Sequence, residues 1–278
     1  DDCNIYYEIE KCNKKGSHFM KPVCLVIGSG AGIGGTVGAR FASEGFHACL
    51  CRRSDAAGLK RLVDNIQNDG FSASGFLLNV IEENAIEERI ALIESEIGPI
   101  EIVVYNLGAQ IGSVPLKDTS YKVFERGWQM GTFGLFRVAK VLFPLMEKRG
   151  KGAVLVTSAT AAVRGNSGQH SHAAAMGGRR MLCQSLNAEF SSKGIHIAHV
   201  LIDGAVDAPD TLGKMLGAKK FQALRETKGL DRDGLLLPSE IADTYFHLAT
   251  QHRSAWTHEI DLRAFSDTPW WNSKTMLD

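Results

Sequence analysis

The sequence predicts an α/β protein built on a doubly wound, seven-stranded parallel sheet in a single domain. Seven short runs rich in Val, Ile, Leu or Phe are separated by stretches whose apolar residues recur at three- and four-residue spacing. The runs are apolar throughout and do not alternate with polar residues, which is typical of parallel strands buried on both faces. A glycine cluster follows the first run at once. These three observations together favour a nucleotide-binding type of sheet.

The expected strands and helices alternate along the chain, and alternation of this kind predicts parallel strands joined by crossover helices. No linker rich in Pro, Gly or Ser divides the chain and no internal repeat is present, so we expect one domain. The strands are Val23–Ile27, Phe46–Cys51, Ser72–Leu78, Ile100–Tyr105, Ala153–Thr157, Ile195–Leu201 and Glu259–Leu262. Helical spacing is clearest in Thr36–Glu44, Ala57–Ile66, Ile86–Ile97, Val138–Met146 and Met181–Phe190.

The composition excludes several classes of function. The 278 residues carry 31 Lys+Arg and 31 Asp+Glu, so the formal net charge is zero, whereas nucleic-acid and anionic-membrane partners normally require a basic surplus. No apolar run approaches the roughly 20 residues of a membrane helix. The six cysteines are too few for a disulfide scaffold, and Cys24, Cys49 and Cys51 lie in apolar runs as small buried hydrophobes. We therefore expect a soluble protein of a reducing compartment, the cytoplasm.

Residues 1–19 are expected to lie outside the fold. They contain no apolar segment of a signal peptide and no Arg/Ser-rich amphipathic pattern of a transit peptide. Gly16-Ser17-His18 resembles the remnant of a cloning or protease site, which predicts that the natural chain begins at Met20. The alternative is an ordered natural extension.

The strongest single site is the glycine loop after the first strand, which reads Gly-Ser-Gly-Ala-Gly-Ile-Gly-Gly from Gly28 to Gly35. Glycines let the backbone turn tightly and approach a pyrophosphate, while the following helix offers unpaired N–H groups to it. Gly30-x-Gly32-x-x-Gly35 matches the general dinucleotide fingerprint, and Gly28-x-x-x-Gly32-Ile33-Gly34 matches a wider spacing. Its place after the first of seven strands favours a Rossmann-type nucleotide site. The expected cofactor contacts are Gly28, Ser29, Gly30, Gly32, Ile33 and Gly34.

The wider glycine spacing resembles that of the short-chain dehydrogenases/reductases (SDRs), and the resemblance continues from about Met20 to Arg263. It implies that Asn79 and Val80 contact the adenine and that Asn106 and Gly108 belong to a second cofactor-binding turn. The motifs that carry it are Asn106-Leu107-Gly108-Ala109, Leu78-Asn79-Val80, Phe143-Pro144-Leu145-Met146, Val154-Leu155-Val156-Thr157-Ser158, and Asp203-Gly204 with Val206.

The end of the second strand predicts which nucleotide is bound. Proteins that select NAD usually end this strand with an acid that binds the ribose 2′-hydroxyl, whereas an Arg accommodates the 2′-phosphate of NADP. Here the strand ends with Arg52-Arg53, and no acid follows until Asp55. Guanidinium groups match phosphate geometry and keep their charge. We therefore expect NADP(H) in preference to NAD, the alternative being two solvated surface arginines.

The catalytic set departs from the family pattern. The resemblance implies a Ser that holds the substrate oxygen, a Tyr that transfers its proton, a Lys four residues later, and an Asn in the preceding long helix. Ser158 is present, but His172 and Met176 stand where the Tyr and the Lys are expected, and Gly131 stands in place of the Asn. The following helix, expected over Gly177–Phe190, fixes this register. None of the five tyrosines lies close enough for a small shift to recover it.

His172 is the candidate replacement for the tyrosine. Its unperturbed pKa of about 6.5 allows an imidazole to carry a proton near neutral pH without a lysine to tune it. Met176 is uncharged and cannot replace an ammonium. The alternative is a histidine satisfied by solvent or by a neighbouring carbonyl. A metal site with His170 lacks an identifiable third ligand.

Three hypotheses follow. The first is an NADP(H)-dependent oxidoreductase in which Ser158 orients a carbonyl or hydroxyl oxygen and His172 shuttles the proton. The second is a catalytically silent NADP(H)-binding homologue, which Gly131 and Met176 favour. The third is a scaffold that kept only the fold, which the intact glycine loop disfavours.

The substrate is expected to be a moderately hydrophobic carbonyl or alcohol. The resemblance implies that residues from about Ala208 to Pro238 form a lid, and this segment is amphipathic and partly apolar. Lys214, Lys219, Lys220 and Arg225 within it would attract an acid or form a solvated helix face. Val163–Asn166 would line the pocket, and Trp256, Trp270 and Trp271 would cap it or a subunit contact. The resemblance also implies a homodimer or homotetramer paired through helices around Tyr121–Met146 and Ala173–Phe190.

Overall fold

The computed structural model of the chain describes residues 20–108, 113–229 and 232–272. The expected seven-stranded parallel sheet is confirmed, with strand order β3-β2-β1-β4-β5-β6-β7. The strands are β1 (Val23–Ile27), β2 (His47–Arg52), β3 (Ala73–Leu77), β4 (Ile100–Tyr105), β5 (Gly152–Ala159), β6 (Ile195–Ile202) and β7 (Glu259–Leu262). The predicted leader, including Cys3 and Cys12, lies outside the described residues.

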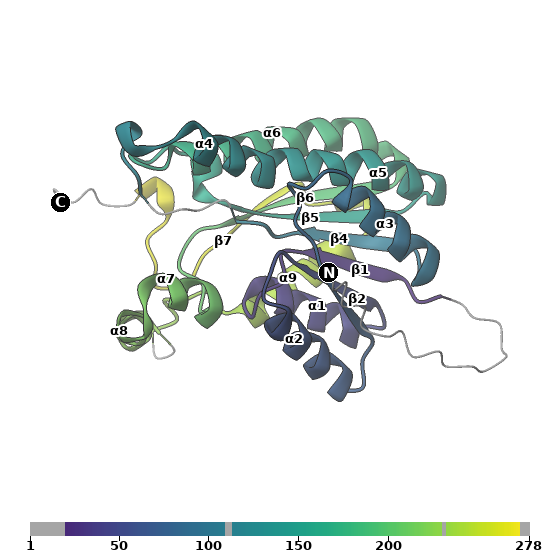
Figure 1. Cartoon of the computed structure of the whole chain (residues 1–278), viewed down its shortest axis with the longest axis horizontal. Coiled ribbons are helices and arrows are strands. Elements are labelled where there is room, and N and C mark those ends of the chain that lie inside the picture. Colours follow the sequence, from purple (N-terminus) through teal and green to yellow (C-terminus); the bar gives the residue numbers. More distant parts are fainter. Residues whose placement is uncertain (1–19, 109–112, 230–231, 273–278) are drawn as a thin grey trace, which may run out of the picture.

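Helices cover both faces of the sheet (Figure 1). One face carries α3 (Ala85–Glu96), α5 (Gly134–Arg149) and α6 (His170–Phe190), with α4 (Tyr121–Trp128) leading into α5. The other face carries α1 (Ile33–Ser43), α2 (Ala56–Asn68) and α9 (Pro238–Ala249). Strand residues alternate between the two cores: Leu25 and Val103 face the first, and Val26 and Val104 face the second. This double burial explains why the strands are apolar throughout.

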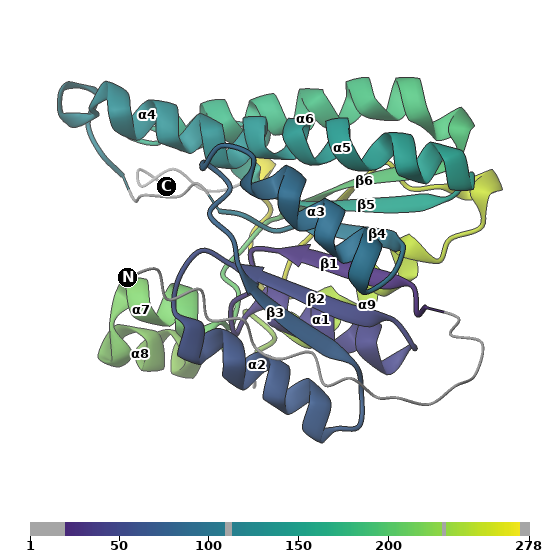
Figure 2. The same ribbon diagram turned by 45° about the vertical axis from the view of Figure 1, so that its right-hand side comes forward.

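The lid region lies beside the carboxyl ends of the strands (Figures 1 and 2). It contains a π-helical turn η5 (Pro209–Gly213), the single-turn α7 (Lys214–Leu216) and α8 (Ala218–Lys228). A second π-helical turn, η2 (Gln129–Phe133), joins α4 to α5. Short 3₁₀ turns are η1 (Leu116–Asp118), η3 (Thr160–Ala162), η4 (Ser191–Lys193), η6 (Arg253–Ala255) and η7 (Trp270–Asn272).

The strand order predicts where a ligand would bind. The chain builds β1, β2 and β3 on one side and then crosses to β4 on the other, so the ends of β1 and β4 flank a crevice. Ligands of open α/β sheets bind in such a crevice, where the strand order reverses. Gly28 follows β1 and Asn106 follows β4 directly. The two motifs of the proposed cofactor site therefore meet at the position that the topology favours.

Two predicted helix boundaries were wrong. The first helix begins at Ile33, three residues before the expected Thr36, and the helix expected from Gly177 begins at His170. The extension of α1 runs through Gly34 and Gly35, where a Cβ atom would lie 2.3 or 2.5 Å from a backbone oxygen of the preceding loop. The extension of α6 contains no glycine, and its three consecutive alanines, residues 173–175, favour a helix. As a result His172 and Met176 lie inside α6. No helix of the described residues is long and apolar enough to cross a membrane.

Candidate active site

The glycine loop is tied closely to the turn after β4. Gly28 has a φ of 104°, a conformation that favours glycine. A Cβ atom on Gly34 would lie 2.3 Å from the Gly28 carbonyl oxygen and 3.0 Å from Asn106 Nδ2. Asn106 Nδ2 donates to that same Gly28 oxygen at 2.9 Å, and Ser29 Oγ donates to Val26 O at 3.0 Å. The loop is thus held by hydrogen bonds that only small residues at 28 and 34 allow.

The N-terminus of α1 is open to an anion. Its cap residue is Gly32, which offers no side-chain hydrogen bond, and the first turn holds no acidic residue. The first N–H groups of a helix lack intrahelical partners and carry a partial positive charge. Ile33 lies in this first turn, while a Cβ on Gly30 would meet nothing within 4 Å. The loop therefore offers the donors and the space that a pyrophosphate requires.

Arg52, the last residue of β2, has one guanidinium nitrogen that is buried without a hydrogen-bond partner. Its Nη2 atom pairs with Asp55 Oδ2 at 3.0 Å, whereas Nη1 is buried without a hydrogen-bond partner. Asp55 also accepts from the Gly58 backbone N–H, and this bond, with Arg52 nearby, lowers the pKa of the Asp55 carboxyl. Arg53 is exposed. A buried guanidinium N–H without a partner is an unsatisfied donor that a phosphate oxygen would satisfy.

The remaining predicted cofactor contacts follow neighbouring strands. Val80 is buried, and Asn79 Nδ2 donates to Glu82 Oε1 at 2.8 Å. The backbone N–H of Asn106 donates to Ile27 O, which fixes the turn that carries Gly108. Ala109 lies outside the described residues.

Ser158 meets Met176 at the end of β5. The serine side chain is buried, and its Oγ donates to Met176 Sδ at 3.9 Å. The thioether is a weak acceptor and carries no charge. The structure therefore brings together two residues that sequence reasoning assigned to the site, but the bond between them is weak and leaves the hydroxyl available to a stronger partner.

His172 lies one helical turn before Met176 in α6 and is buried. Its Nδ1 atom has no hydrogen-bond partner. Burial, and next the positive charge of Arg179, lower the pKa of His172 below its ordinary value of 6.5. The lowered pKa favours the neutral imidazole at pH 7, and its Nδ1 atom is buried without a partner.

Gly131, the residue expected in place of an asparagine, leaves no room for a larger side chain. A Cβ atom there would lie 2.7 Å from Ala175 Cβ, and one on Gly127 would lie 2.1 Å from Ser171 Oγ. Small residues on both sides let η2 and α4 approach α6 closely. Glycine at 131 thus allows close packing between η2 and α6, and a larger side chain would force them apart.

Sequence reasoning missed Arg179, which is 1% exposed. Its Nε donates to Gly131 O at 2.7 Å, Nη1 to Thr157 O at 2.5 Å and Nη2 to Leu107 O at 2.8 Å. The available signal was its position, because Arg179 shares a helix face with His172, seven residues earlier, and with Met176, three residues earlier. A charged residue on the buried face of a helix is uncommon and indicates a specific interaction.

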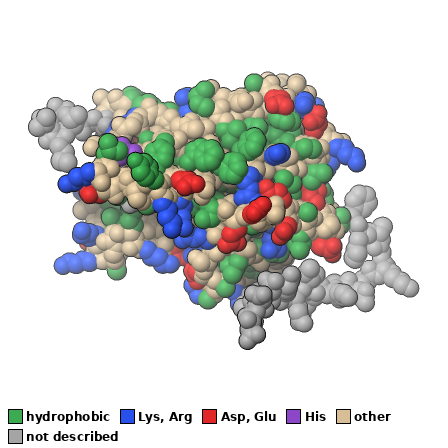
Figure 3. Space-filling view, turned by 45° about the horizontal axis from the view of Figure 1, so that its top comes forward, with side chains coloured by type: hydrophobic (Ala, Val, Ile, Leu, Met, Phe, Trp, Pro, Cys, Tyr) green, Lys and Arg blue, Asp and Glu red, His purple; other side chains and the backbone are tan. Residues whose placement is uncertain are grey.

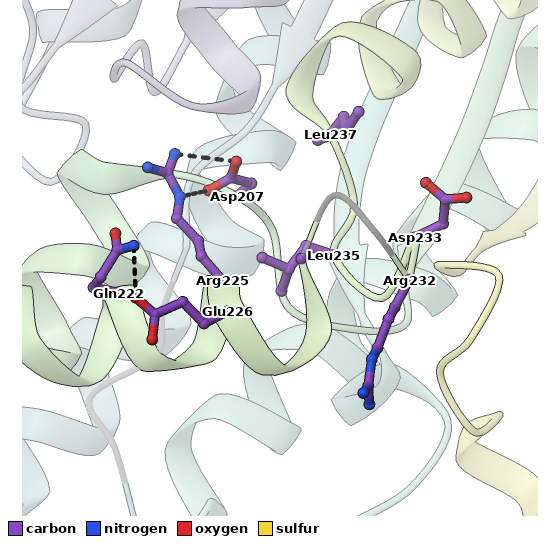
Figure 4. A pocket seen from close by; sticks show the side chains of 9 residues that line it. Asp207, Gln222, Arg225, Glu226, Arg232, Asp233, Leu235 and Leu237 are labelled. Carbon is purple, nitrogen blue, oxygen red and sulfur yellow. Dashed lines mark hydrogen bonds and ion pairs between the residues drawn. The ribbon is translucent and has the colours of Figure 1, made fainter.

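The lid carries its own ion pairs. Arg225 binds Asp207 through two hydrogen bonds of 2.7 and 3.1 Å, and Lys214 lies 3.4 Å from Asp210. Figure 4 shows the Arg225–Asp207 pair among the residues that line a cavity, which also include Leu235 and Leu237. The cavity has a volume of about 420 Å³. These pairs neutralise two of the four basic residues, Lys214 and Arg225, that the sequence left open as an acid-binding face.

The predicted aromatic caps lie in different places. Trp256 stacks on His196 at the start of β6, at the amino ends of the strands and away from the carboxyl ends where the site lies. Trp270 is close to the site loops: its backbone carbonyl accepts from Arg164 Nη1 at 2.6 Å and its backbone N–H donates to Asp203 Oδ2 at 3.0 Å. Of the two, Trp270 can border the substrate pocket and Trp256 cannot.

Comparison with known proteins places the chain in a family. The model of the short chain dehydrogenases matches residues 22–211, and the chain belongs to this family of oxidoreductases. A 7α-hydroxysteroid dehydrogenase of Escherichia coli K12 is 26% identical over 226 residues, which are 78% of this chain and 87% of that protein. A short-chain dehydrogenase from Rhodopseudomonas palustris has a similar structure, with a TM-score of 0.73 at 29% identity over 88% of this chain and 99% of its own. A gluconate 5-dehydrogenase from Burkholderia cenocepacia, solved with NADP and tartrate, shares the fold with a TM-score of 0.73 at 22% identity over 87% and 93% of the two chains.

Proposed function

We propose that the protein is an NADP(H)-dependent oxidoreductase that interconverts a carbonyl and an alcohol, with His172 as the acid–base group. The observation that carries this proposal is the buried His172 with an unpartnered Nδ1, one helical turn from the Met176 that touches Ser158. When bound, the nicotinamide supplies the hydride acceptor or donor. The glycine loop and the N-terminus of α1 would hold the pyrophosphate of NADP(H), and Arg52 would hold its 2′-phosphate.

The residues of the chain then handle the substrate oxygen and its proton. Ser158 Oγ, held only weakly by Met176, donates to the substrate oxygen and orients it. The neutral His172 accepts the hydroxyl proton as the hydride leaves the alcohol carbon, so a C–H and an O–H bond break while the carbonyl forms. In the opposite direction the imidazolium returns the proton. A positioned acid–base group contributes about 10²–10⁴-fold to such a step.

Arg52 and Arg53 are proposed to select NADP(H). Changing both to Ala is expected to weaken NADPH binding by about 10–100-fold, because a charged hydrogen bond contributes about 1.5–3 kcal/mol, and to leave NADH binding within about twofold. Calorimetric titration with both nucleotides measures this. Arg253→Ala, at an exposed arginine of η6, is the control. Equal affinity of the parent protein for the two nucleotides would refute the assignment.

A catalytically silent NADP(H)-binding protein is the second candidate. It is favoured by the contact of Ser158 with a thioether and by the absence of room for a side chain at Gly131. The two candidates differ in one result. The silent protein would bind NADPH tightly, yet would oxidise none of it when mixed with a panel of moderately hydrophobic ketones and aldehydes.

The proposed substrate is a small, moderately hydrophobic carbonyl or alcohol. The lid presents an apolar side chain, Met215, which is 58% exposed, while its basic residues Arg225 and Lys214 form ion pairs with acids.

The proposed location is the cytoplasm. Cys24, Cys49, Cys51 and Cys183 are free and buried, which supports a reducing compartment.

We also propose a homodimer or homotetramer that pairs through α4 and α5. Figure 3 shows hydrophobic side chains gathered over these helices. Trp128, Phe133 and Phe136 are 44, 39 and 43% exposed, and their rings stack in sequence with centroid distances of 5.2 and 6.2 Å. An exposed row of aromatic rings supports a protein interface.

The double variant Trp128→Lys and Phe136→Lys is expected to convert the oligomer into monomers, because buried unpaired ammonium groups oppose association. Light scattering after size-exclusion chromatography measures the mass. Phe71→Lys, at a 40% exposed phenylalanine away from α4 and α5, is the control and should stay oligomeric. A parent protein that is monomeric at micromolar concentration would contradict the proposal.

A further inference from the structure

Arg179 is a buried cation without a carboxylate partner. Among the described residues it is the one buried arginine, and each of its three guanidinium nitrogens donates to a backbone carbonyl. Its guanidinium also lies over the Tyr105 ring, 5.1 Å from the centroid. The next residue, Arg180, is different, since it binds Glu259 at 2.6 Å. A charge buried on neutral partners is unfavourable unless every donor is well placed.

The three carbonyls belong to three separate segments of the site. Leu107 lies between Asn106 and Gly108, and Thr157 directly precedes Ser158. Gly131 lies in η2, whose π-helical hydrogen bonding is typical of functional sites. One rigid, planar group therefore joins the end of β4, the end of β5 and the π-helical turn η2, which packs against Ala175 and Met176 of α6.

Tyr105, the last residue of β4, contacts both the guanidinium of Arg179 and the turn η2. Its hydroxyl donates to Met130 O at 2.5 Å, in the same π-helical turn, and its ring packs against the guanidinium. A Cβ atom on Gly134 would lie 2.2 Å from the Tyr105 hydroxyl, so the turn approaches the ring as closely as glycine allows. Two adjacent carbonyls of η2 thus accept from two buried side chains, and the turn is fixed relative to the sheet.

We propose that Arg179 is the positioning residue of this site: it fixes the turns that carry Asn106 and Ser158 against η2, and it supplies, one turn beyond Met176, the permanent positive charge that residue 176 lacks. This inference rests on the proposed function for its cofactor and its proton transfer. The anchoring itself concerns the chain alone. A lysine could not replace it fully, because a single ammonium cannot reach three carbonyls in three directions.

The test compares Arg179→Met, Arg179→Lys and the control Arg180→Met with the parent protein. Hydrogen exchange of the segments around Asn106, Ser158 and Gly131 measures the anchoring. We expect exchange to be at least tenfold faster in both Arg179 variants and unchanged in the control. NADPH affinity should fall at least tenfold in both, since charged hydrogen bonds to the cofactor-binding turn are lost.

A second measurement separates the charge from the packing. The pKa of His172, followed by NMR of the imidazole nitrogens, should rise in Arg179→Met and stay near the parent value in Arg179→Lys, because only the first removes the nearby charge. If Arg179→Met does not fold, Arg179→Lys carries the test, with faster exchange and a retained His172 pKa expected.

Parent-like exchange in both variants, or a His172 pKa that Arg179→Met leaves unchanged, would overturn the proposal. Failure of the proposed function looks different. In that case the parent itself would not bind NADPH, while the exchange and His172 measurements would still decide the role of Arg179.

Discussion

His172→Ala is expected to lower turnover by about 10²–10⁴-fold while leaving NADPH affinity within about twofold. The imidazole is the group in the site that can carry a proton near neutral pH, and Met176 and Gly131 offer none. Its role begins only when the substrate oxygen is held by Ser158, so removal of the ring should act on kcat and spare the cofactor. Steady-state kinetics and calorimetry on the same preparations measure the two quantities.

The matched control is His170→Ala, which removes the histidine two residues earlier, at the first residue of α6. It should keep parent-like turnover. Equal activity in His172→Ala and the parent would exclude His172 as the acid–base group. An activity that vanishes together with NADPH binding would show that the residue supports the fold of the site and not the proton transfer.

The pH dependence has a definite sign. Burial, and the charge of Arg179, lower the pKa of His172 below 6.5, so the neutral base dominates at pH 7. Alcohol oxidation needs this base, and its rate should therefore be level above pH 7 and fall as the pH drops through the lowered pKa. Carbonyl reduction needs the imidazolium and should decline as the pH rises above the same pKa. The two profiles should cross, and profiles that rise together would contradict the assignment.

Gly34→Ala is expected to weaken NADPH binding by more than about 100-fold, which corresponds to more than about 2.7 kcal/mol. The new Cβ would lie 2.3 Å from Gly28 O and 2.9 Å from Ser29 Cα, and both contacts are backbone that no side-chain rotation can relieve. The loop must then move away from Asn106, whose Nδ2 lies 3.0 Å from the same point. The donors of the cradle would no longer converge on one site.

Gly177→Ala is the matched control for this change. Gly177 lies inside α6, and a Cβ there would meet nothing within 4 Å. Alanine should stabilise the helix by about 0.5–1 kcal/mol and leave NADPH affinity unchanged. Calorimetry and thermal unfolding on both variants separate loop geometry from general stability. Parent-like NADPH affinity in Gly34→Ala would show that the loop is not the phosphate cradle.

The sheet could be predicted from the sequence because its signal is local. Val23–Ile27, Ile100–Tyr105 and Glu259–Leu262 were each expected at the bounds that the structure gives. Strands buried on both faces need continuous apolar runs, and the glycine loop needs residues without side chains, so both can be recognised from the residue types in the sequence. The position of Ser158 at the end of β5 could be predicted from the apolar run that directly precedes it.

The rest depends on contacts between distant segments. The start of α6 at His170 was not predicted, because it depends on Gly127 of α4 and Gly131 of η2, which pack against Ser171 and Ala175. Arg179 is similar. Its role comes from carbonyls of residues 107, 131 and 157, which only the fold brings together.

The central claim is that this family member binds NADP(H) at the glycine loop, and calorimetric titration of the protein from Met20 onward with NADPH and with NADH, without substrate, tests it most directly. The account predicts one site per chain, with NADPH bound about 10–100-fold more tightly than NADH, as expected for a charged hydrogen bond from Arg52 or Arg53 to the 2′-phosphate. Binding of neither nucleotide would contradict the account and leave a scaffold protein that kept the fold.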